Sequence, residues 1–559
     1  MPPARAAVSF VGMVRSLRIA PAVCLLLAAC GDDKAASDTA VSATSAATGT
    51  DSATGTGTGT AAGTATDATG TTGAPFEPIP ARGITIERVQ ANQGVGVDIG
   101  LDGVGVEGGD RASYLMQGRI MLIRGFWKFL GEWQPREIEA RLTLHYPDGT
   151  TYEQSQIKFI DADPFEGDLK RTFYFGLMED EVVPGIKYEM TLWETQPGQE
   201  GNPESDPPPR LPYVGTYPIG IEDSDQQLEI IIVPFSYNDG AGCDTPAENS
   251  DETLKLFESY MYSQNPVDRT KISFHEPIAW NQKLSDFNEL NEYMSDLRFD
   301  EGAGPHVYYF GLVDVCSGGL GGAGGKAYGI PSIPATKGQA YQRVSSGLWL
   351  PKNQEWSAET FVHEVGHSQG RLHINCGGAA GYDPNYPYPE GQVGEWGFGV
   401  RDFGLRHPAV YKDYMTYCHP TWVGTWGWNK VYPVIKETTK WSYEAPPAPG
   451  EDPYGGHSLL VGSVYPDGHS TWHTVPGEVT DEELSATDEV EFIGAGGLVA
   501  RHPAAVKRQP EGEVINIVVR LPDAWDTITA IKHRSPSTER TIEAKSVKVH
   551  HTSRAIKAR

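Results

Sequence analysis

Alternation of apolar and polar residues marks two β-rich regions of the chain. From about Pro75 to Ile221, REIEARLTLHYPDG alternates and ends in a Pro-Asp-Gly turn, and RTFYFGLM and KYEMTLWET follow between further turn residues. After about Ala445, HSLLVGSVYP, DEVEFIGAGG, EVINIVVRLP and RTIEAKSVKVH repeat this pattern. Short alternating strands separated by turns are typical of β-sandwiches. The pattern therefore predicts sandwiches over residues 76–225 and 445–559.

The region between them, residues 226–444, alternates strands with helices. QLEIIIVPFSY is apolar enough to form a buried strand, and KISFHEPIAW and HVYYFGLVDV read as further strands. DETLKLFESYMYS reads as a helix capped by Ser250 or Asp251, LSDFNELNEYMSDLR as a second, and SAETFVHEVGHSQG as a third capped by Ser357. Strands and helices in succession predict an α/β or α+β domain of the kind that carries catalytic sites.

The N-terminus indicates export. Met13–Cys30 reads MVRSLRIAPAVCLLLAAC, with basic residues, a short apolar run and small residues before a cleavage point, so residues 1–30 are predicted to be a signal peptide. The run is too short to span a bilayer. Leu-Ala-Ala-Cys resembles a bacterial lipobox, which would lipidate Cys30; ordinary cleavage with an unmodified Cys30 is the alternative. Residues 31–75, rich in Ala, Ser, Thr and Gly, are predicted to be a flexible linker. We expect an exported protein, lipid-anchored to the cell envelope at the outer membrane or cell surface, or secreted.

Charge and glycine spacing argue against two classes of partner. The 559 residues carry 73 acidic and 45 basic side chains, a formal charge of −28. This balance is unfavourable for a nucleic-acid partner. GGLGGAGGKAY lacks the first glycine and the final Ser or Thr of a phosphate-binding loop, so no nucleotide site is predicted.

Cysteine usage agrees with export. Of the six cysteines, Cys24 belongs to the signal and Cys30 to the lipidation motif. Four remain, namely Cys243, Cys316, Cys376 and Cys418. In an exported chain they predict two disulfides, for which three connectivities are possible.

Chemistry concentrates in HEVGHSQGRLH, residues 363–373. His363 and His367 are four residues apart on a predicted helix, so both imidazoles face one side and could bind one zinc ion. Glu364 lies between them and can act as a base on a zinc-bound water without being a ligand. Gly370 can adopt a positive φ and end the helix, which would let His373 reach the metal as a third ligand. Three protein ligands and a water are typical of a catalytic zinc.

This stretch resembles the metzincin signature HExxHxxGxxH. The resemblance implies that Met415, in KDYMTYCHP, forms a turn beneath the metal, and that Tyr417 stabilises an oxyanion; ordinary core packing is the alternative for both. HVYYFGLVDVCSGGLGGAGGKAYGIP, NCGG, YPYPEGQVGEWGFG and DYMTYCHPTWVGTWGW follow the order found in the StcE-like secreted mucinase family of metzincins, over about Gln227 to Thr439. Ser368-Gln369 and Trp426-Gly427-Trp428 depart from that pattern. The likeness also suggests Cys376–Cys418 and Cys243–Cys316 as the disulfide pairs.

The resemblance predicts a multidomain protein, an α+β metzincin-like zinc protease domain flanked by N- and C-terminal β-sandwiches. Its expected activity is that of a zinc metalloendopeptidase with one catalytic Zn²⁺ ion. Its expected substrates are extracellular proteins or glycoproteins, with O-glycosylated, mucin-like proteins as the candidate class. The alternative is a catalytically inactive surface adhesin or glycan-binding lipoprotein.

Overall fold

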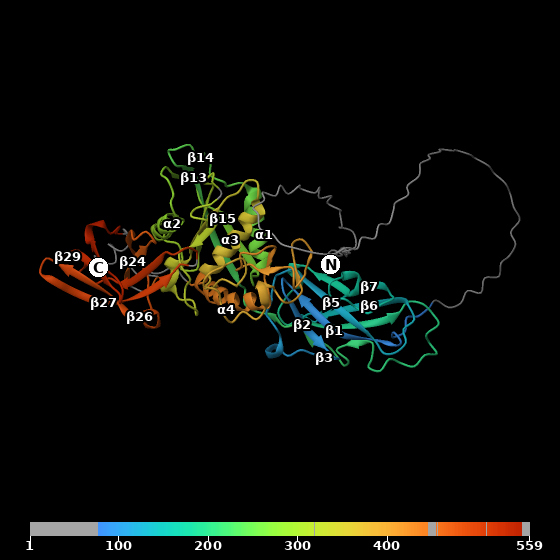
Figure 1. The fold of residues 1–559 in the computed structure, drawn as a ribbon. Helices are drawn as coiled ribbons and strands as arrows, with labels where there is room; N and C mark the ends of the chain where they lie inside the picture. Colours follow the sequence, from blue (N-terminus) through green and yellow to red (C-terminus); the bar gives the residue numbers. More distant parts are fainter. Residues whose placement is uncertain (1–75, 318, 445–453, 455–456, 510, 550–559) are drawn as a thin grey trace, which may run out of the picture. The chain divides into compact units, whose positions relative to one another are not determined.

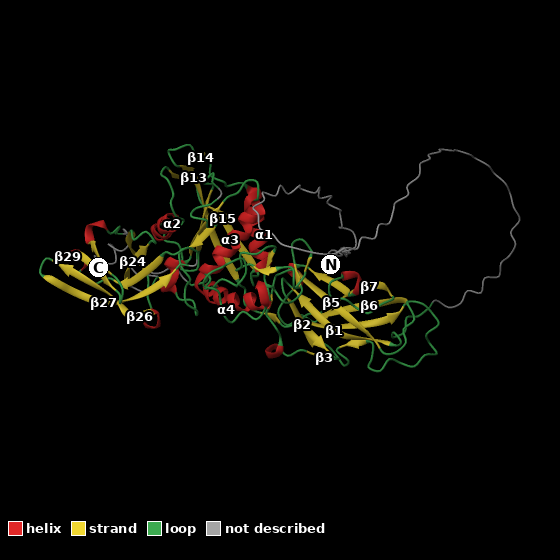
Figure 2. Cartoon of the chain, in the orientation of Figure 1, coloured by secondary structure: helices red, strands yellow, loops and turns green. Residues whose placement is uncertain are grey.

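The computed structural model describes residues 76–317, 319–444, 454, 457–509 and 511–549. The signal peptide, Cys30 and nearly all of the linker lie outside these residues. In the described part, strands predominate and the α-helices gather in one region (Figures 1 and 2). No helix of that part is both long and apolar enough to cross a bilayer.

The N-terminal strands form two facing sheets, as the alternation predicts. One sheet has the order β3-β2-β1-β5-β8 and the other β10-β9-β6-β7, with β11 also paired to β9. Their bounds are β1 Ile84–Asn92, β2 Gly96–Leu101, β3 Val104–Gly105, β5 Met121–Phe129, β6 Arg136–His145, β7 Thr151–Ile160, β8 Phe173–Leu177, β9 Lys187–Glu194, β10 Arg210–Leu211 and β11 Tyr217–Pro218. Every second residue of β6, from Ile138 to Leu144, enters the core between the sheets.

The middle region is a mixed sheet between helices. Its strands are β13 Gln227–Asn238, β14 Asp244–Thr245, β15 Arg269–Phe274, β16 Ile278–Trp280, β17 Tyr308–Val313, β18 Gly325–Ala327 and β19 Val344–Leu348. Strand β13 pairs in parallel with β15, β16 and β17, β17 with β19, and β18 closes an edge antiparallel to β19. Because β13 is covered on both faces, Ile230 and Ile232 enter one core and Val233 and Phe235 another.

The helices of this region are α1 Asp251–Gln264, α2 Asn288–Asp300, α3 Gln354–Ser368 and α4 Thr425–Ser442. Helices α1, α3 and α4 pack on one face of the sheet and α2 on the other. Ser250 caps α1 by accepting from Thr253 N, in agreement with one of the two predicted caps. The cap predicted for α3 is wrong. Helix α3 begins three residues before Ser357, whose buried hydroxyl instead accepts from Leu350 N and ties the helix to the preceding loop.

The C-terminal strands form one seven-stranded antiparallel sheet of order β25-β24-β28-β27-β26-β29-β30. They are β24 Ser458–Val464, β25 Ser470–Pro476, β26 Leu484–Gly494, β27 Gly497–Arg508, β28 Ile515–Arg520, β29 Ile528–Arg534 and β30 Glu539–Glu543. The sandwich expected here is thus a single sheet around its own core, which includes Leu460, Phe492 and Ile531. After β30 the chain returns to the opposite edge, where Lys548 exchanges backbone hydrogen bonds with β25.

Shorter elements complete the described chain. The strands are β4 Leu115–Met116, β12 Ile221–Glu222, β20 Gly397–Phe398, β21 Leu405–Arg406, β22 Lys412–Asp413 and β23 Thr421–Trp422. The 3₁₀ helices are η2 Gly108–Asp110, η3 Leu169–Arg171, η4 Glu179–Glu181, η5 Lys337–Gln342, η6 Pro389–Gly391, η7 Asp481–Glu483, η8 Trp525–Thr527 and η9 Ala544–Ser546.

One buried arginine joins the N-terminal sandwich to the middle region. Arg119 has no exposed surface, and its guanidinium donates to four backbone carbonyls, those of Gln93, Ser263, Asn265 and Val267. Its guanidinium carbon Cζ also lies 4.2 Å from the ring centroid of Tyr262 and 5.1 Å from that of Trp428. Burial lowers the pKa of Arg119 to about 10, so it remains charged at neutral pH. Carbonyl dipoles and aromatic faces therefore solvate a cation inside this junction.

Candidate metal centre

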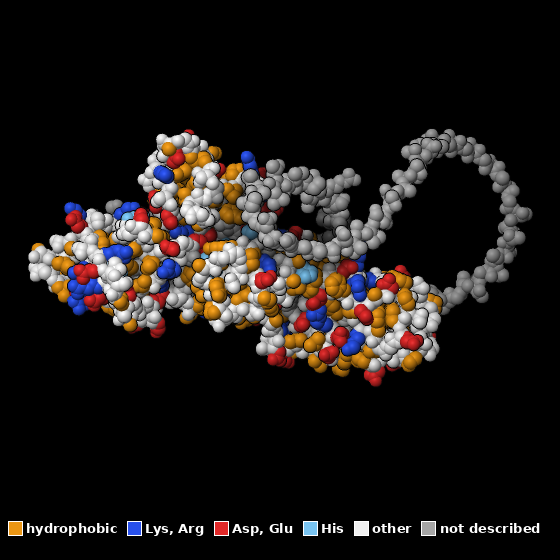
Figure 3. Space-filling model, in the orientation of Figure 1, with side chains coloured by type: hydrophobic (Ala, Val, Ile, Leu, Met, Phe, Trp, Pro, Cys, Tyr) orange, Lys and Arg blue, Asp and Glu red, His pale blue; other side chains and the backbone are white. Residues whose placement is uncertain are grey.

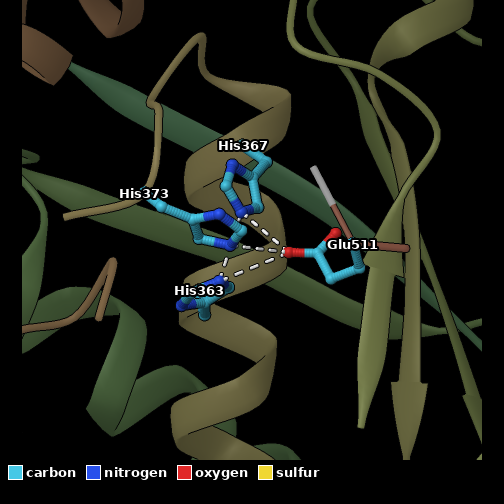
Figure 4. Close-up of side chains that lie close together, drawn as sticks. All are labelled: His363, His367, His373 and Glu511. Carbon is cyan, nitrogen blue, oxygen red and sulfur yellow. Dashed lines mark hydrogen bonds and ion pairs between the residues drawn. The ribbon is translucent and has the colours of Figure 1, made fainter. Parts of the chain in front are cut away.

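Helix α3 carries the first two predicted ligands. His363 and His367 are buried on one side of the helix, and their Nε2 atoms are 3.2 Å apart (Figure 4). Gly366, one residue before His367, has no side chain, and a Cβ there would lie 2.6 Å from Met415 Sδ. The glycine thus lets Met415 pack directly against this turn of the helix.

The turn after α3 brings in the third predicted ligand. Gly370 N donates to His367 O at 2.8 Å and Arg371 N donates to Gly366 O at 3.0 Å, which is the Schellman pairing of a helix end. Gly370 has φ +88°, so the predicted positive φ is confirmed. The reversal places His373, 1% exposed, beside the two helical histidines.

Backbone carbonyls orient all three imidazoles. The Nδ1 atoms of His363, His367 and His373 donate to the carbonyls of Tyr414, Arg371 and Ala380, each at 2.7 Å. A carbonyl oxygen only accepts, so each Nδ1 carries the proton and each Nε2 presents a lone pair to the centre. Burial lowers the pKa of His367 to about 4, which keeps this imidazole neutral. Three converging lone pairs repel one another unless a cation lies between them.

A fourth donor, Glu511, comes from the turn between β27 and β28. Its Oε1 lies 3.0 Å from His367 Nε2, 3.0 Å from His373 Nε2 and 3.6 Å from His363 Nε2 (Figure 4). Glu511 could not be predicted from the motif, because it lies 138 residues beyond His373 in the sequence.

The four donor atoms fit a metal ion. A tetrahedral site with bonds of about 2.0–2.1 Å has donor-to-donor edges of about 3.3 Å, and the four edges given above range from 3.0 to 3.6 Å. The residues form a buried group that could hold one ion. The coarser part of the cofactor prediction, a metal-binding group at these histidines, therefore agrees with the structure.

A cleft of about 420 Å³ opens beside this group. Its lining includes Glu364, Tyr417, Lys326, Trp356 and residues 320–325 of the glycine-rich loop. Glu364 is 2% exposed, and its Oε2 has no hydrogen-bond partner among the described residues. Burial, and next the charge of Glu511, raise the pKa of Glu364 well above its ordinary value. A raised pKa makes this carboxylate a stronger base, which suits it to accept a proton.

The residues that the resemblance places beneath and beside the metal occupy different environments. Met415 is fully buried in a turn, where its N–H donates to Asp413 Oδ1 at 2.9 Å. Tyr417 is 43% exposed in the cleft, and its ring centroid lies 4.9 Å from that of His373. Their roles stay predictions, but core packing does not account for the exposure of Tyr417.

Two disulfides close the loops around the site. Cys243 is bonded to Cys316 and Cys376 to Cys418, so the predicted pairing is confirmed. The second bridge links the loop after His373 to the turn that contains Met415.

The comparisons with known proteins assign no family. No family model matches the chain, and no curated protein matches it. Among solved structures, a calcium-binding mutant of Bacteroides uniformis β-glucuronidase 2 has 10% identity and a TM-score of 0.12, over 42% of this chain and 28% of that one. A Paenibacillus cycloisomaltooligosaccharide glucanotransferase has 10% identity and a TM-score of 0.14, over 82% and 72%. A putative β-galactosidase from Bacteroides fragilis has 9% identity and a TM-score of 0.13, over 84% and 74%.

These comparisons correct the predicted function. The sequence predicts an endopeptidase of extracellular proteins, whereas the solved structures found are a β-glucuronidase, a glucanotransferase and a putative β-galactosidase, and none is a protease. At such TM-scores the likeness assigns no glycan chemistry to this chain. The physical reason for the correction lies in the motif itself. HExxHxxGxxH specifies metal donors and a base, but none of its residues recognises the bond that is cleaved. The motif therefore does not identify peptide bonds as the substrate.

Proposed function

We propose that the protein is a zinc-dependent hydrolase with a metzincin-type centre, in which His363, His367 and His373 hold the ion. The observation that carries this proposal is the convergence of three buried Nε2 lone pairs, each fixed by an Nδ1–H bond to a backbone carbonyl. Neutral imidazoles in a tetrahedral arrangement favour zinc over calcium or magnesium, which prefer oxygen ligands.

In this proposal the chain's own residues supply proton transfer and substrate placement. When bound, zinc lowers the pKa of water and polarises an electrophilic group of the substrate. Glu364 lies beside the histidines with a free carboxylate oxygen, so it takes the proton and later returns it to the leaving group. Tyr417, which lines the same cleft and is partly exposed there, donates a hydrogen bond to the developing oxyanion in this proposal.

Metal analysis of the full chain tests the proposal. We expect one zinc per chain, and none in the double variant His363→Ala/His367→Ala, because one remaining imidazole is an incomplete site. Labelled casein, p-nitrophenyl acetate and p-nitrophenyl glycosides then serve as substrates for amide, ester and glycosidic hydrolysis. A chain that takes up no stoichiometric zinc contradicts the proposal. So does hydrolysis that the Glu364→Gln variant performs at the wild-type rate.

We also propose that the protein is exported and anchored through lipid on Cys30. The paired cysteines support export, because disulfides persist in oxidising compartments. Cys30→Ser should release the protein from sedimented membranes, because the variant lacks the residue that would carry the anchoring lipid. A variant that still sediments with membranes would indicate another anchor.

A further inference from the structure

The turn that carries Glu511 is built into the middle region, from which the three histidines come. Gln509 Nε2 donates to Asn288 Oδ1 at 2.6 Å, and Asn516 Nδ2 donates to Tyr328 O at 2.9 Å. All four of these side chains are buried. On either side of the turn, Ala505 and Val518 enter a core that they share with Tyr328. The position of Glu511 is therefore determined by buried contacts on both sides of it.

The Glu511 carboxylate faces the three histidines and has no other hydrogen-bond partner among the described residues. The residue is 5% exposed, its Oε1 contacts the three imidazoles, and its Oε2 has no hydrogen bond among the described residues. A buried carboxylate without compensating bonds is costly. Its placement is favourable if Glu511 is a ligand of a bound cation.

Glu511 Oε1 takes the position that a hydrolytic centre needs to keep open. A catalytic zinc has three protein ligands and one position for water or substrate, whereas a fourth protein ligand gives the closed arrangement of structural sites. A structural site has no need of a carboxylate base or a cleft beside it. Here Glu364 and the cleft of about 420 Å³ adjoin the ligands, and Glu511 itself lines that cleft.

We propose that Glu511 is a fourth, displaceable protein ligand, supplied by the C-terminal sheet, which blocks the open coordination position and keeps the enzyme latent. This inference rests on the proposed function. The ligand that displaces Glu511 is an oxygen donor that enters through the cleft, such as a carboxylate, a hydroxamate or the carbonyl of a substrate. The C-terminal sheet is then a regulator of the metal centre.

Cobalt-substituted full-length protein and acetohydroxamate test the inference without relying on turnover. The visible absorption of cobalt reports its coordination, and acetohydroxamate competes for the position of Glu511. An apparent dissociation constant rises in inverse proportion to the open fraction of a site, so a site blocked for nine-tenths of the time or more binds at least about tenfold more weakly. We expect Glu511→Ala to keep one metal per chain and to bind acetohydroxamate at least about tenfold more tightly than the wild type.

Two further variants control the test. Glu511→Gln keeps the size of the side chain and guards against misfolding of Glu511→Ala; it should also bind the hydroxamate more tightly. Glu513→Ala removes an exposed carboxylate from the same turn and should behave as the wild type. Equal hydroxamate binding by the wild type and both Glu511 variants would overturn the inference and leave the proposed function intact. Loss of metal from folded Glu511 variants would make Glu511 an obligatory structural ligand and also overturn it. A wild-type chain without metal would contradict the proposed function itself.

Discussion

The buried ion pair between Arg371 and Asp413 should be one of the most sensitive points of the site. Arg371 Nη2 lies 3.0 Å from one Asp413 oxygen and 3.1 Å from the other, and the two side chains are 3% and 0% exposed. Each partner also supports the metal centre. The Arg371 carbonyl accepts from His367 Nδ1, and Asp413 accepts from the backbone of Met415.

Asp413→Asn keeps the shape of the side chain but leaves the Arg371 charge buried without a counter-charge. Removing one partner of a buried pair typically costs about 3–5 kcal/mol of unfolding free energy. Because asparagine retains an oxygen for the Met415 N–H, we expect the lower end, about 3 kcal/mol. The double variant Arg371→Met/Asp413→Asn should recover part of this loss, since it removes the unpaired charge.

Guanidinium unfolding in the presence of a chelator, followed by tryptophan fluorescence, measures the loss apart from any change in zinc affinity. Glu437→Gln is the matched control, because Glu437 pairs with Lys440 on an exposed face of α4 and such pairs contribute at most about 1 kcal/mol. A loss for Asp413→Asn under about 1 kcal/mol, or no larger than that of the control, would refute the assignment of a stabilising buried pair. Zinc affinity, measured separately, should fall by about 10–100-fold, as is usual when the support of a ligand is lost.

Three further predictions follow from single sites. The Glu364→Gln variant should keep its zinc, but its rate of hydrolysis should be about 10²–10⁴-fold lower than that of the wild type on the same substrate. Loss of zinc from this variant would instead indicate that Glu364 is a ligand. Burial raises the pKa of Asp268 from 3.8 to about 7, so the folded state retains a proton that the unfolded state has released. Stability should therefore fall as the pH rises from about 4 to about 7, and Asp268→Asn should make that fall in thermal stability smaller; an unchanged pH dependence would contradict this. Cys376→Ser/Cys418→Ser opens a loop with a sequence separation of 42 and should destabilise the protein by up to about 4 kcal/mol; an unchanged melting temperature would contradict this.

Local patterns were sufficient to predict much of this structure. Alternation identified β6 and β9, and the apolar run at residues 227–237 identified the central strand β13. The histidines could be predicted because helix geometry relates positions four apart, and because a glycine was available for the reversal before His373. In each case the interacting residues are close in the sequence, so their spacing carries the information.

Contacts between distant segments could not be predicted in this way. Glu511 is one of 73 acidic residues, and no spacing distinguishes it from the others. Its role depends on how the β27–β28 turn docks on α2, through Gln509 and Asn288. The α3 cap was misassigned for a related reason. Serine is a residue type that favours helix N-caps, but the Ser357 hydroxyl accepts a hydrogen bond from Leu350 N in the preceding loop. The bond that is cleaved could not be predicted either, because no residue of the motif recognises it.

The carbonyl-lined burial of Arg119 has a mechanical consequence. A hinge between the sandwich and the sheet-and-helix body would have to break hydrogen bonds to Ser263, Asn265 and Val267 and expose the ring faces that cover the guanidinium. The two parts should therefore move together in solution as a single rigid body. A partner long enough to touch both parts would therefore meet two surfaces held at a fixed separation.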